Sequence, residues 1–264
     1  MLAAFGDVPR TAVGSFRAVF ETVTRDGGAG GGAGVIPIEN VVNGTVRENY
    51  DLLLEHDLEI VGEVVVPVRL CLAALPGQSI DAIERVYSHI QALGQAESFL
   101  RTRPWQLLTT YNTAGAGKSI VEGREQGAAA VLSPRAATLF GLEVLAEGIQ
   151  DLPDNRTRFL VIAERGTAAH QPAAAGGPPR TTLALAVRNE PGTLLAVLEV
   201  FARHGLNMSK LESRPSRERA WEYVFWVDLD ADAHDPATRM ALDELRDVTT
   251  MLRILGSYPR GEGA

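Results

Sequence analysis

Residues 151–162, DLPDNRTRFLVI, join a polar turn directly to an apolar run. The run from Arg158 to Ile162 predicts a buried strand, because short apolar runs bounded by turn residues pack into the interior of a sheet. Pro153 to Asn155 have the composition of a turn. Thr157 is therefore expected at the end of a strand, where open α/β sheets bind ligands, although an ordinary solvated loop has the same composition.

Two further stretches carry short motifs in a fixed order. The first has Val35–Asn40 (VIPIEN) followed by Gly44–Val46, and the second has Gly192–Leu194 (GTL) followed by Glu212–Pro215 (ESRP). Together with Thr157–Phe159 they resemble the prephenate dehydratase family. The resemblance implies an α/β catalytic domain of two lobes, similar to periplasmic binding proteins, and an α+β ferredoxin-like ACT domain that senses phenylalanine.

Length and charge limit the classes of function. The chain has 264 residues, enough for two domains, and its net charge of −8 gives no basic footprint for nucleic acid or an anionic membrane. Its one cysteine, Cys71, lies in an apolar run and is expected to be a small buried hydrophobe. No apolar run approaches the roughly 18 residues of a membrane span, and no export signal is recognisable, so we expect a cytoplasmic protein.

The first part of the chain alternates strand-like and helix-like segments, which predicts a mostly parallel sheet in each lobe. Apolar residues recur at helical spacing from Phe16 to Val23, and residues 27–34 contain only Gly and Ala, as in a flexible connection. We expect the catalytic domain to cover residues 1–166, with the second lobe at about 68–145. In the family, the strands that cross between the lobes form a hinge around the substrate cleft.

The last part of the chain has a different composition. Residues 167–180 are rich in Ala, Gly and Pro and predict a linker. In residues 181–264 the periodicity alternates between strand and helix in the order βαββαβ, the ferredoxin-like pattern. This order agrees with the ACT domain that the resemblance implies.

Two nucleotide-binding motifs are nearly present and are rejected. Residues 28–33 match a relaxed dinucleotide fingerprint, but a helix precedes them where a strand is required. Residues 112–119 nearly spell a phosphate-binding loop, but Asn112 replaces its first Gly and no magnesium-holding Asp follows the next strand. We expect an ordinary helix start with Thr113 as a possible cap, and we expect neither a metal nor a cofactor.

The resemblance implies that the segment Thr157–Phe159 carries out the reaction. The family converts prephenate to phenylpyruvate, a carbon–oxygen lyase reaction that releases carbon dioxide and water. Thr157 matches the family's essential threonine and is expected to donate a hydrogen bond to the leaving hydroxyl. Arg158 is expected either to hold a carboxylate or to brace the loop. Phe159 is expected either to exclude water beside the departing carboxylate or to pack in the core.

Five neutral side chains are expected to bind the substrate, because amides and hydroxyls stabilise anions in a dry cleft without burying cations. One pair lies in residues 88–91, SHIQ, which resemble a Ser-His-Pro-Gln segment of the family. Glu39 is expected to hold the lobe rather than the anionic substrate. The five candidates are Asn40, Thr45, Ser88, Gln91 and Asn155.

The resemblance places the regulatory site in the second domain, between the ACT domains of two subunits, and so implies a homodimer or homotetramer. The expected phenylalanine-binding residues are Asn189, Gly192, Thr193, Leu194, Glu212, Ser213, Arg214 and Pro215. A plain surface ion pair between Arg214 and Glu212 is the simpler alternative for those two residues.

The N-terminal residues indicate a departure from the family. Residues 1–6 resemble the helix that follows the family's first strand and Gly-Thr-Phe-type loop, so we expect that strand to be missing from this sequence. The alternative function is a non-catalytic phenylalanine sensor that retains a degenerate cleft.

Overall fold

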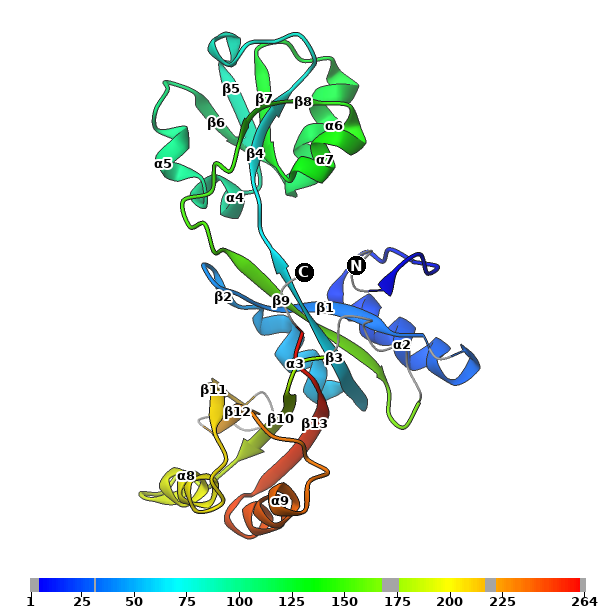
Figure 1. Ribbon diagram of the computed structural model, residues 1–264, viewed down its shortest axis with the longest axis vertical. Helices are drawn as coiled ribbons and strands as arrows, with labels where there is room; N and C mark the ends of the chain where they lie inside the picture. Colours follow the sequence, from blue (N-terminus) through cyan, green and yellow to red (C-terminus); the bar gives the residue numbers. More distant parts are fainter. Residues whose placement is uncertain (1–4, 31, 168–175, 217–221, 262–264) are drawn as a thin grey trace. The chain divides into compact units, whose positions relative to one another are not determined.

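The computed structural model describes residues 5–30, 32–167, 176–216 and 222–261, without the side chains of residues 26–30 (Figure 1). The chain divides into two units. Unit 1 contains Met1–Ile38, Val46–Val66 and Arg158–Ala264, and unit 2 contains Glu39–Thr45 and Pro67–Thr157. Within the described part, none of the helices has both the length and the apolar composition needed to cross a membrane.

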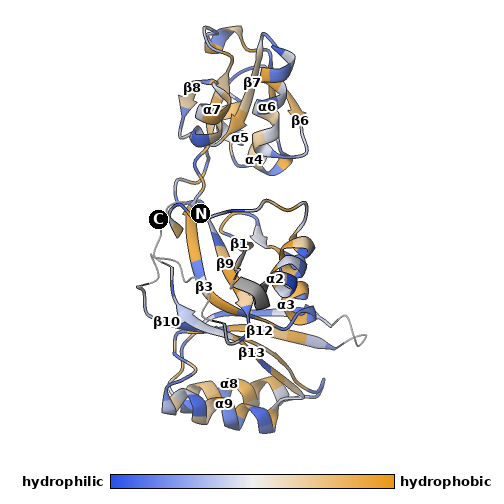
Figure 2. Cartoon of the chain, turned by 90° about the vertical axis from the view of Figure 1, so that its right-hand side faces the viewer, coloured by the Kyte–Doolittle hydropathy of each residue, from blue (hydrophilic) through white to orange (hydrophobic). Residues whose placement is uncertain are grey.

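The first sheet has four strands in the order β2-β1-β9-β3. Buried and partly buried positions alternate along β1, because successive side chains of a strand point to opposite faces. The hydrophobic stretches of β3 and β9 are orange in Figure 2. The strands are β1 (Gly34–Asn40), β2 (Gly44–Thr45), β3 (Leu58–Pro67) and β9 (Arg156–Glu164), and the helices are α2 (Phe16–Gly30) and α3 (Arg47–Glu55).

The structure corrects the expected flexible connection at residues 27–34. Helix α2 continues to Gly30, and β1 already begins at Gly34. Extending an existing helix adds one hydrogen bond for each residue fixed, so a helix that has already formed can run on into poor helix formers. A side chain on Gly34 would lie 2.7 Å from Val19 and 2.9 Å from Val23, so the glycine lets β1 pass close to the helix.

The sheet of unit 2 has five strands in the order β6-β5-β7-β4-β8. Strand β5 is parallel to β6 and β7, but β4 is antiparallel to β7 and β8, so the prediction of a mostly parallel sheet is wrong here. Local periodicity predicts strands and not their directions. The strands are β4 (Cys71–Ala74), β5 (Arg85–Ser88), β6 (Gln106–Thr109), β7 (Ala128–Leu132) and β8 (Glu143–Glu147).

Short helices flank this sheet. The start of α6 is capped by Asn112, whose side chain accepts from the amide of Gly115, and not by Thr113 as predicted. Cys71 is fully buried, as expected, and burial raises the pKa of its thiol to about 11. The helical elements are η1 (Ile80–Ala82), α4 (Ile90–Gly94), α5 (Glu97–Leu100), α6 (Thr113–Gly123) and α7 (Pro134–Phe140).

The C-terminal domain has the predicted βαββαβ order. Its four strands lie in the order β11-β12-β10-β13 with antiparallel neighbours, which confirms the ferredoxin-like fold. Helices α8 and α9 run side by side on one face of this sheet (Figure 2). The elements are β10 (Pro179–Ala186), α8 (Thr193–Arg203), β11 (Met208–Pro215), β12 (Tyr223–Leu229), α9 (Pro236–Val248) and β13 (Met251–Pro259).

The predicted linker lies partly outside the described residues, which omit 168–175. Its last residues are not a linker, because β10 already begins at Pro179 and pairs with β13.

The second face of the C-terminal sheet packs against the first lobe. Trp226 of β12 is buried in one core cluster with Ile60 of β3, and its ring meets that of Tyr50 edge-on at 4.6 Å between centroids. Gly256 of β13 lies against the backbone of Ile60, where a Cβ atom would come within 2.1 Å of the carbonyl oxygen. The C-terminal sheet and β3 are therefore joined by direct packing.

Candidate functional site

Asn40, at the end of β1, is the centre of a buried hydrogen-bond cluster. Its Oδ1 accepts from the backbone amides of Val42 and Asn43, at 3.0 and 2.9 Å. Because these two donors identify the oxygen of the amide group, the nitrogen must be the atom that faces Thr157. The Asn40 Nδ2 lies 3.0 Å from the Thr157 Oγ1.

This contact determines which way the Thr157 hydroxyl can donate. An amide nitrogen donates and does not accept, so Asn40 gives a hydrogen to Thr157 Oγ1 and leaves the threonine's own hydrogen directed elsewhere. The same Nδ2 also lies 2.9 Å from Asn155 Oδ1 and 3.0 Å from the carbonyl oxygen of Arg156. The Asn40 side chain thus contacts the Asn155 side chain, the backbone of Arg156 and the Thr157 hydroxyl.

Asn155 contributes a buried donor to the same cluster. Its side chain is 1% exposed, and its Nδ2 has no hydrogen-bond partner among the described residues. A buried donor without a partner costs about 1–3 kcal/mol, so a ligand oxygen that accepts from this group would recover that cost. Asn40, Asn155 and Thr157, three of the predicted residues, are therefore brought together.

The other predicted substrate donors occupy different surroundings. Thr45 is partly buried in β2, paired with Glu39 of β1, and Gln91 is exposed in the first turn of α4. Ser88 is fully buried at the end of β5, where its hydroxyl donates to the carbonyl of Val131 at 2.6 Å. The Ser88 hydrogen is therefore used inside the sheet.

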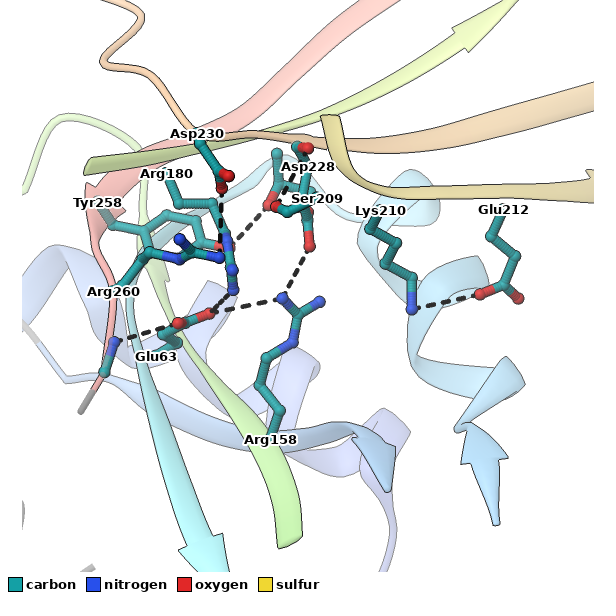
Figure 3. A network of polar contacts seen from close by, with 12 residues as sticks. Glu63, Arg158, Arg180, Ser209, Lys210, Glu212, Asp228, Asp230, Tyr258 and Arg260 are labelled. Atoms are coloured by element: carbon teal, nitrogen blue, oxygen red, sulfur yellow. Dashed lines mark hydrogen bonds and ion pairs between the residues drawn. The ribbon is translucent and has the colours of Figure 1, made fainter. Parts of the chain in front are cut away.

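Arg158 and Phe159, which follow Thr157 in β9, lie in different surroundings. Arg158 forms an ion pair with Asp228 of β12 at 2.7 Å and lies 3.6 Å from Glu63 of β3 (Figure 3). Of the two roles expected for Arg158, these contacts favour bracing over binding a substrate carboxylate. Phe159 is partly buried in the same strand.

The GTL motif lies at the start of α8, with Gly192 as its N-cap and Thr193 and Leu194 as its first two residues. Gly192 has a φ of +86°, a left-handed conformation that favours glycine. The Thr193 hydroxyl lies 2.7 Å from the carbonyl oxygen of Arg188 and 2.9 Å from that of Glu190. Asn189 is exposed and Leu194 is partly buried.

The ESRP motif lies on β11, an edge strand of its sheet. The Arg214 guanidinium forms an ion pair with Asp51 of α3 at 3.1 Å and also donates to the carbonyl of Arg47 at 2.6 Å. Glu212 lies 3.4 Å from Lys210, so the simple Arg214–Glu212 surface pair does not describe these residues.

The other two motif residues, Ser213 and Pro215, are exposed on β11. Pro215 and Arg214 also line a cavity of about 430 Å³ between α3 and the C-terminal sheet, together with Tyr223 and Trp226.

Sequence reasoning missed the acidic residues that hold Arg158. Glu63 and Asp228 are each 2% exposed, and each interrupts an apolar strand. A charged residue inside a strand that is otherwise buried was the signal that could have found them, because buried charges are paired.

The fold and the cluster define the class of protein: an α/β domain in which a hydroxyl and two side-chain amides meet, followed by a ferredoxin-like domain. The family model for prephenate dehydratase matches residues 2–167, and that for the ACT domain matches residues 181–247. The chain therefore belongs to the prephenate dehydratase family.

Named relatives agree with this assignment. The chain is 42% identical over 229 residues to a bifunctional chorismate mutase/prephenate dehydratase of Aquifex aeolicus, covering 86% of this chain and 61% of that protein. It is 40% identical over 243 residues to arogenate dehydratase 5, chloroplastic, of Arabidopsis thaliana, covering 85% and 56%. The chain thus spans less than two thirds of the length of these relatives.

Among solved structures, the fold is similar to a prephenate dehydratase from Arthrobacter aurescens in complex with L-Phe. The TM-score is 0.83 at 30% sequence identity, and the match covers 99% of this chain and 88% of that one.

Proposed function

We propose that this chain is a prephenate dehydratase, converting prephenate to phenylpyruvate, carbon dioxide and water. The observation that carries the proposal is the hydrogen bond from Asn40 Nδ2 to Thr157 Oγ1. It leaves the threonine hydrogen available as a donor at a strand end. The family membership of the chain supports the same activity.

In the proposed reaction the bond between the ring and its carboxylate breaks, and its electron pair enters the ring as the ring hydroxyl leaves. Carbon dioxide departs, the ring becomes aromatic, and the hydroxide takes up a proton to form water. Thr157 donates a hydrogen bond to the oxygen as its negative charge develops. Because a threonine hydroxyl is a very weak acid, Thr157 stabilises the leaving group or relays a proton and is not the ultimate acid.

Asn155 is the best-supported partner for an oxygen of the substrate. Its buried Nδ2 has no partner in the described part of the chain, and an anionic oxygen there would receive a hydrogen bond in surroundings of low dielectric constant. Thr45, Gln91 and Phe159 remain proposed binding residues, whereas Ser88 does not, because its hydroxyl hydrogen is used by the Val131 carbonyl.

We propose that L-phenylalanine inhibits the enzyme through the ACT domain. The left-handed turn at Gly192 exposes backbone beside Asn189 and Leu194, and the edge strand β11 carries Ser213 on its exposed side. An exposed edge strand pairs readily with another copy, so we also propose a homodimer or homotetramer. Inhibition requires phenylalanine to bind one conformation of the enzyme more tightly than another.

The proposal is tested by an ultraviolet assay of the purified chain with prephenate, with arogenate, and with each in the presence of L-phenylalanine. Turnover of prephenate with inhibition by phenylalanine is expected. Turnover of arogenate alone would assign the activity named for the plant relatives. Phenylalanine binding without turnover of either compound would favour a non-catalytic sensor.

Replacing Asn40 with aspartate should lower kcat by about 100-fold, because a carboxylate would accept the Thr157 hydrogen that the amide leaves free. The aspartate can still accept from the amides of Val42 and Asn43, so the turn should persist. The matched control is Asn49→Asp, since Asn49 is a fully buried asparagine that donates to the carbonyl of Pro37. Equal losses of kcat in the two folded variants would contradict the orienting role of Asn40.

Substitutions of Gly192 and Ser213 should relieve inhibition by phenylalanine and leave the uninhibited rate within about twofold. An alanine at Gly192 is strained by its positive φ, at a cost of about 1 kcal/mol, and distorts the proposed binding turn. Inhibition curves and calorimetric titration with phenylalanine measure both effects. An equal loss of uninhibited rate would show that the motifs only support the fold.

A further inference from the structure

Four buried charges join the ACT sheet to the first lobe (Figure 3). Glu63 of β3 accepts from Arg180 of β10 at 2.6 Å, and Asp228 of β12 accepts from Arg158 of β9 at 2.7 Å. The side chains of the two acids are each 3% exposed, those of the arginines 8% and 14%. Glu63 also lies 3.6 Å from Arg158, so the two pairs form one neutral network.

The hydrogen bonds of this network have a defined direction. The Thr182 hydroxyl donates to Asp228 Oδ1 at 2.7 Å, and because it has one hydrogen, the Tyr258 hydroxyl must donate to Thr182. Burial raises the pKa of Tyr258 far above its ordinary value, which keeps this phenol protonated. Asp228 therefore accepts one hydrogen bond from Thr182 at Oδ1 and one from Arg158 at Oδ2.

Arg158 keeps its charge in this position. Burial alone would lower its pKa, but Asp228 and Glu63 raise it above the ordinary value. Removing one partner from a buried ion pair typically costs about 3–5 kcal/mol, because the other charge is left uncompensated. Asp228 is thus a strong restraint on the position of the Arg158 side chain and of the backbone that carries it.

That backbone is shared with the proposed catalytic residue. Thr157 and Arg158 are consecutive in β9, so their side chains point to opposite faces of the strand and one peptide unit joins them. Asn40 holds the Thr157 side. Asp228 holds the Arg158 side.

We propose that Asp228 of the ACT domain is a positioning residue for the dehydratase reaction, fixing Arg158 and through it the adjoining Thr157. This inference rests on the proposed function. According to this inference, the ACT sheet holds β9, the strand that carries Thr157, in position even when no phenylalanine is bound. A misplacement of about 1 Å in a reacting group can lower the rate by about 100-fold, so a restraint of this kind is large enough to matter.

Two close backbone approaches make the link stiff. A Cβ atom added at Gly256 would lie 2.1 Å from the carbonyl oxygen of Ile60. One added at Gly261 would lie 2.5 Å from the carbonyl oxygen of Glu63. The Gly261 amide also donates to the Glu63 carboxylate at 3.1 Å. The ACT sheet therefore lies in direct backbone contact with β3 beside the network.

The test compares Asp228→Asn with Asp230→Asn, the same substitution two residues further along the chain. Asp230 accepts from Asn207 and pairs with Arg260, within the ACT domain. In Asp228→Asn the carboxylate charge that compensates the buried Arg158 guanidinium is lost, whichever way the new amide is turned. We expect kcat to fall about tenfold with KM within about twofold, and we expect Asp230→Asn to keep the parental values.

A second measurement does not depend on activity. Hydrogen exchange of the amides at residues 155–159 should be faster in Asp228→Asn than in the parent and in Asp230→Asn, each measured well below its melting temperature. Unchanged exchange in this segment would overturn the inference even if no dehydratase activity were found. If the parent is active, an unchanged kcat in a folded Asp228→Asn would also overturn it, and a rise in KM alone would indicate that Arg158 binds substrate instead.

Discussion

Thr157→Ala is expected to lower kcat for prephenate by about 1,000-fold and to leave the melting temperature within a few degrees of the parent. Loss of one hydrogen-bond donor aimed at a developing oxyanion costs about 100- to 1,000-fold in related chemistry, and Thr157 is the proposed donor to the leaving hydroxyl. The side chain is only partly buried, so little packing is removed.

The fold should tolerate this change because no polar group loses its last partner. Asn40 Nδ2 has two hydrogens and three acceptors within reach, and two acceptors remain after Thr157 is shortened: Asn155 Oδ1 and the Arg156 carbonyl. Binding of phenylalanine, measured by calorimetry, should match that of the parent. These two measurements separate a catalytic loss from unfolding.

Two further variants at this position refine the test. Thr157→Ser keeps the hydroxyl and should retain kcat within about tenfold, the loss arising from a side chain with more rotamers. Thr157→Val keeps the branched shape without the hydroxyl and should be as inactive as the alanine variant. Near-normal turnover in Ala or Val would remove Thr157 from the mechanism.

Much of the local structure could be predicted from the sequence. The buried strand at Arg158–Ile162 lies within the observed β9, and the order of the ACT elements follows the change of period between strand and helix. These features depend on neighbours in sequence, which periodicity reports directly. The start of β9 at Arg156 places Thr157 inside the strand, slightly further in than the turn residues indicated.

Features that depend on distant residues could not be predicted in this way. The antiparallel pairing of β4 is a property of how strands assemble and has no local signal. Likewise, Asn40 was expected to be a substrate donor, and only the fold brings it to Thr157, 117 residues away in sequence. The pairing of Arg158 with Asp228 spans 70 residues and is equally hidden from pattern analysis.

Gly256→Ala is expected to be among the most destabilising single substitutions in the chain. The added Cβ would lie 2.1 Å from the carbonyl oxygen of Ile60, and both positions are backbone in strands, so neither can move as a side chain can. Overpacking of this kind costs about 3 kcal/mol or more, which corresponds to a fall of about 10 °C in melting temperature for a chain of this size.

The matched control is Gly94→Ala. Gly94 ends helix α4, and a Cβ there would meet no atom within 4 Å, so the substitution should be neutral or stabilise by up to about 1 kcal/mol. Thermal melting compares the two variants. Hydrogen exchange adds a local readout, because pushing β13 away from β3 should raise exchange in residues 58–67 and 251–259 first. Equal melting temperatures for the two alanine variants would show that β13 and β3 do not approach so closely, and the rigid link between the ACT sheet and the catalytic strand would lose its structural basis.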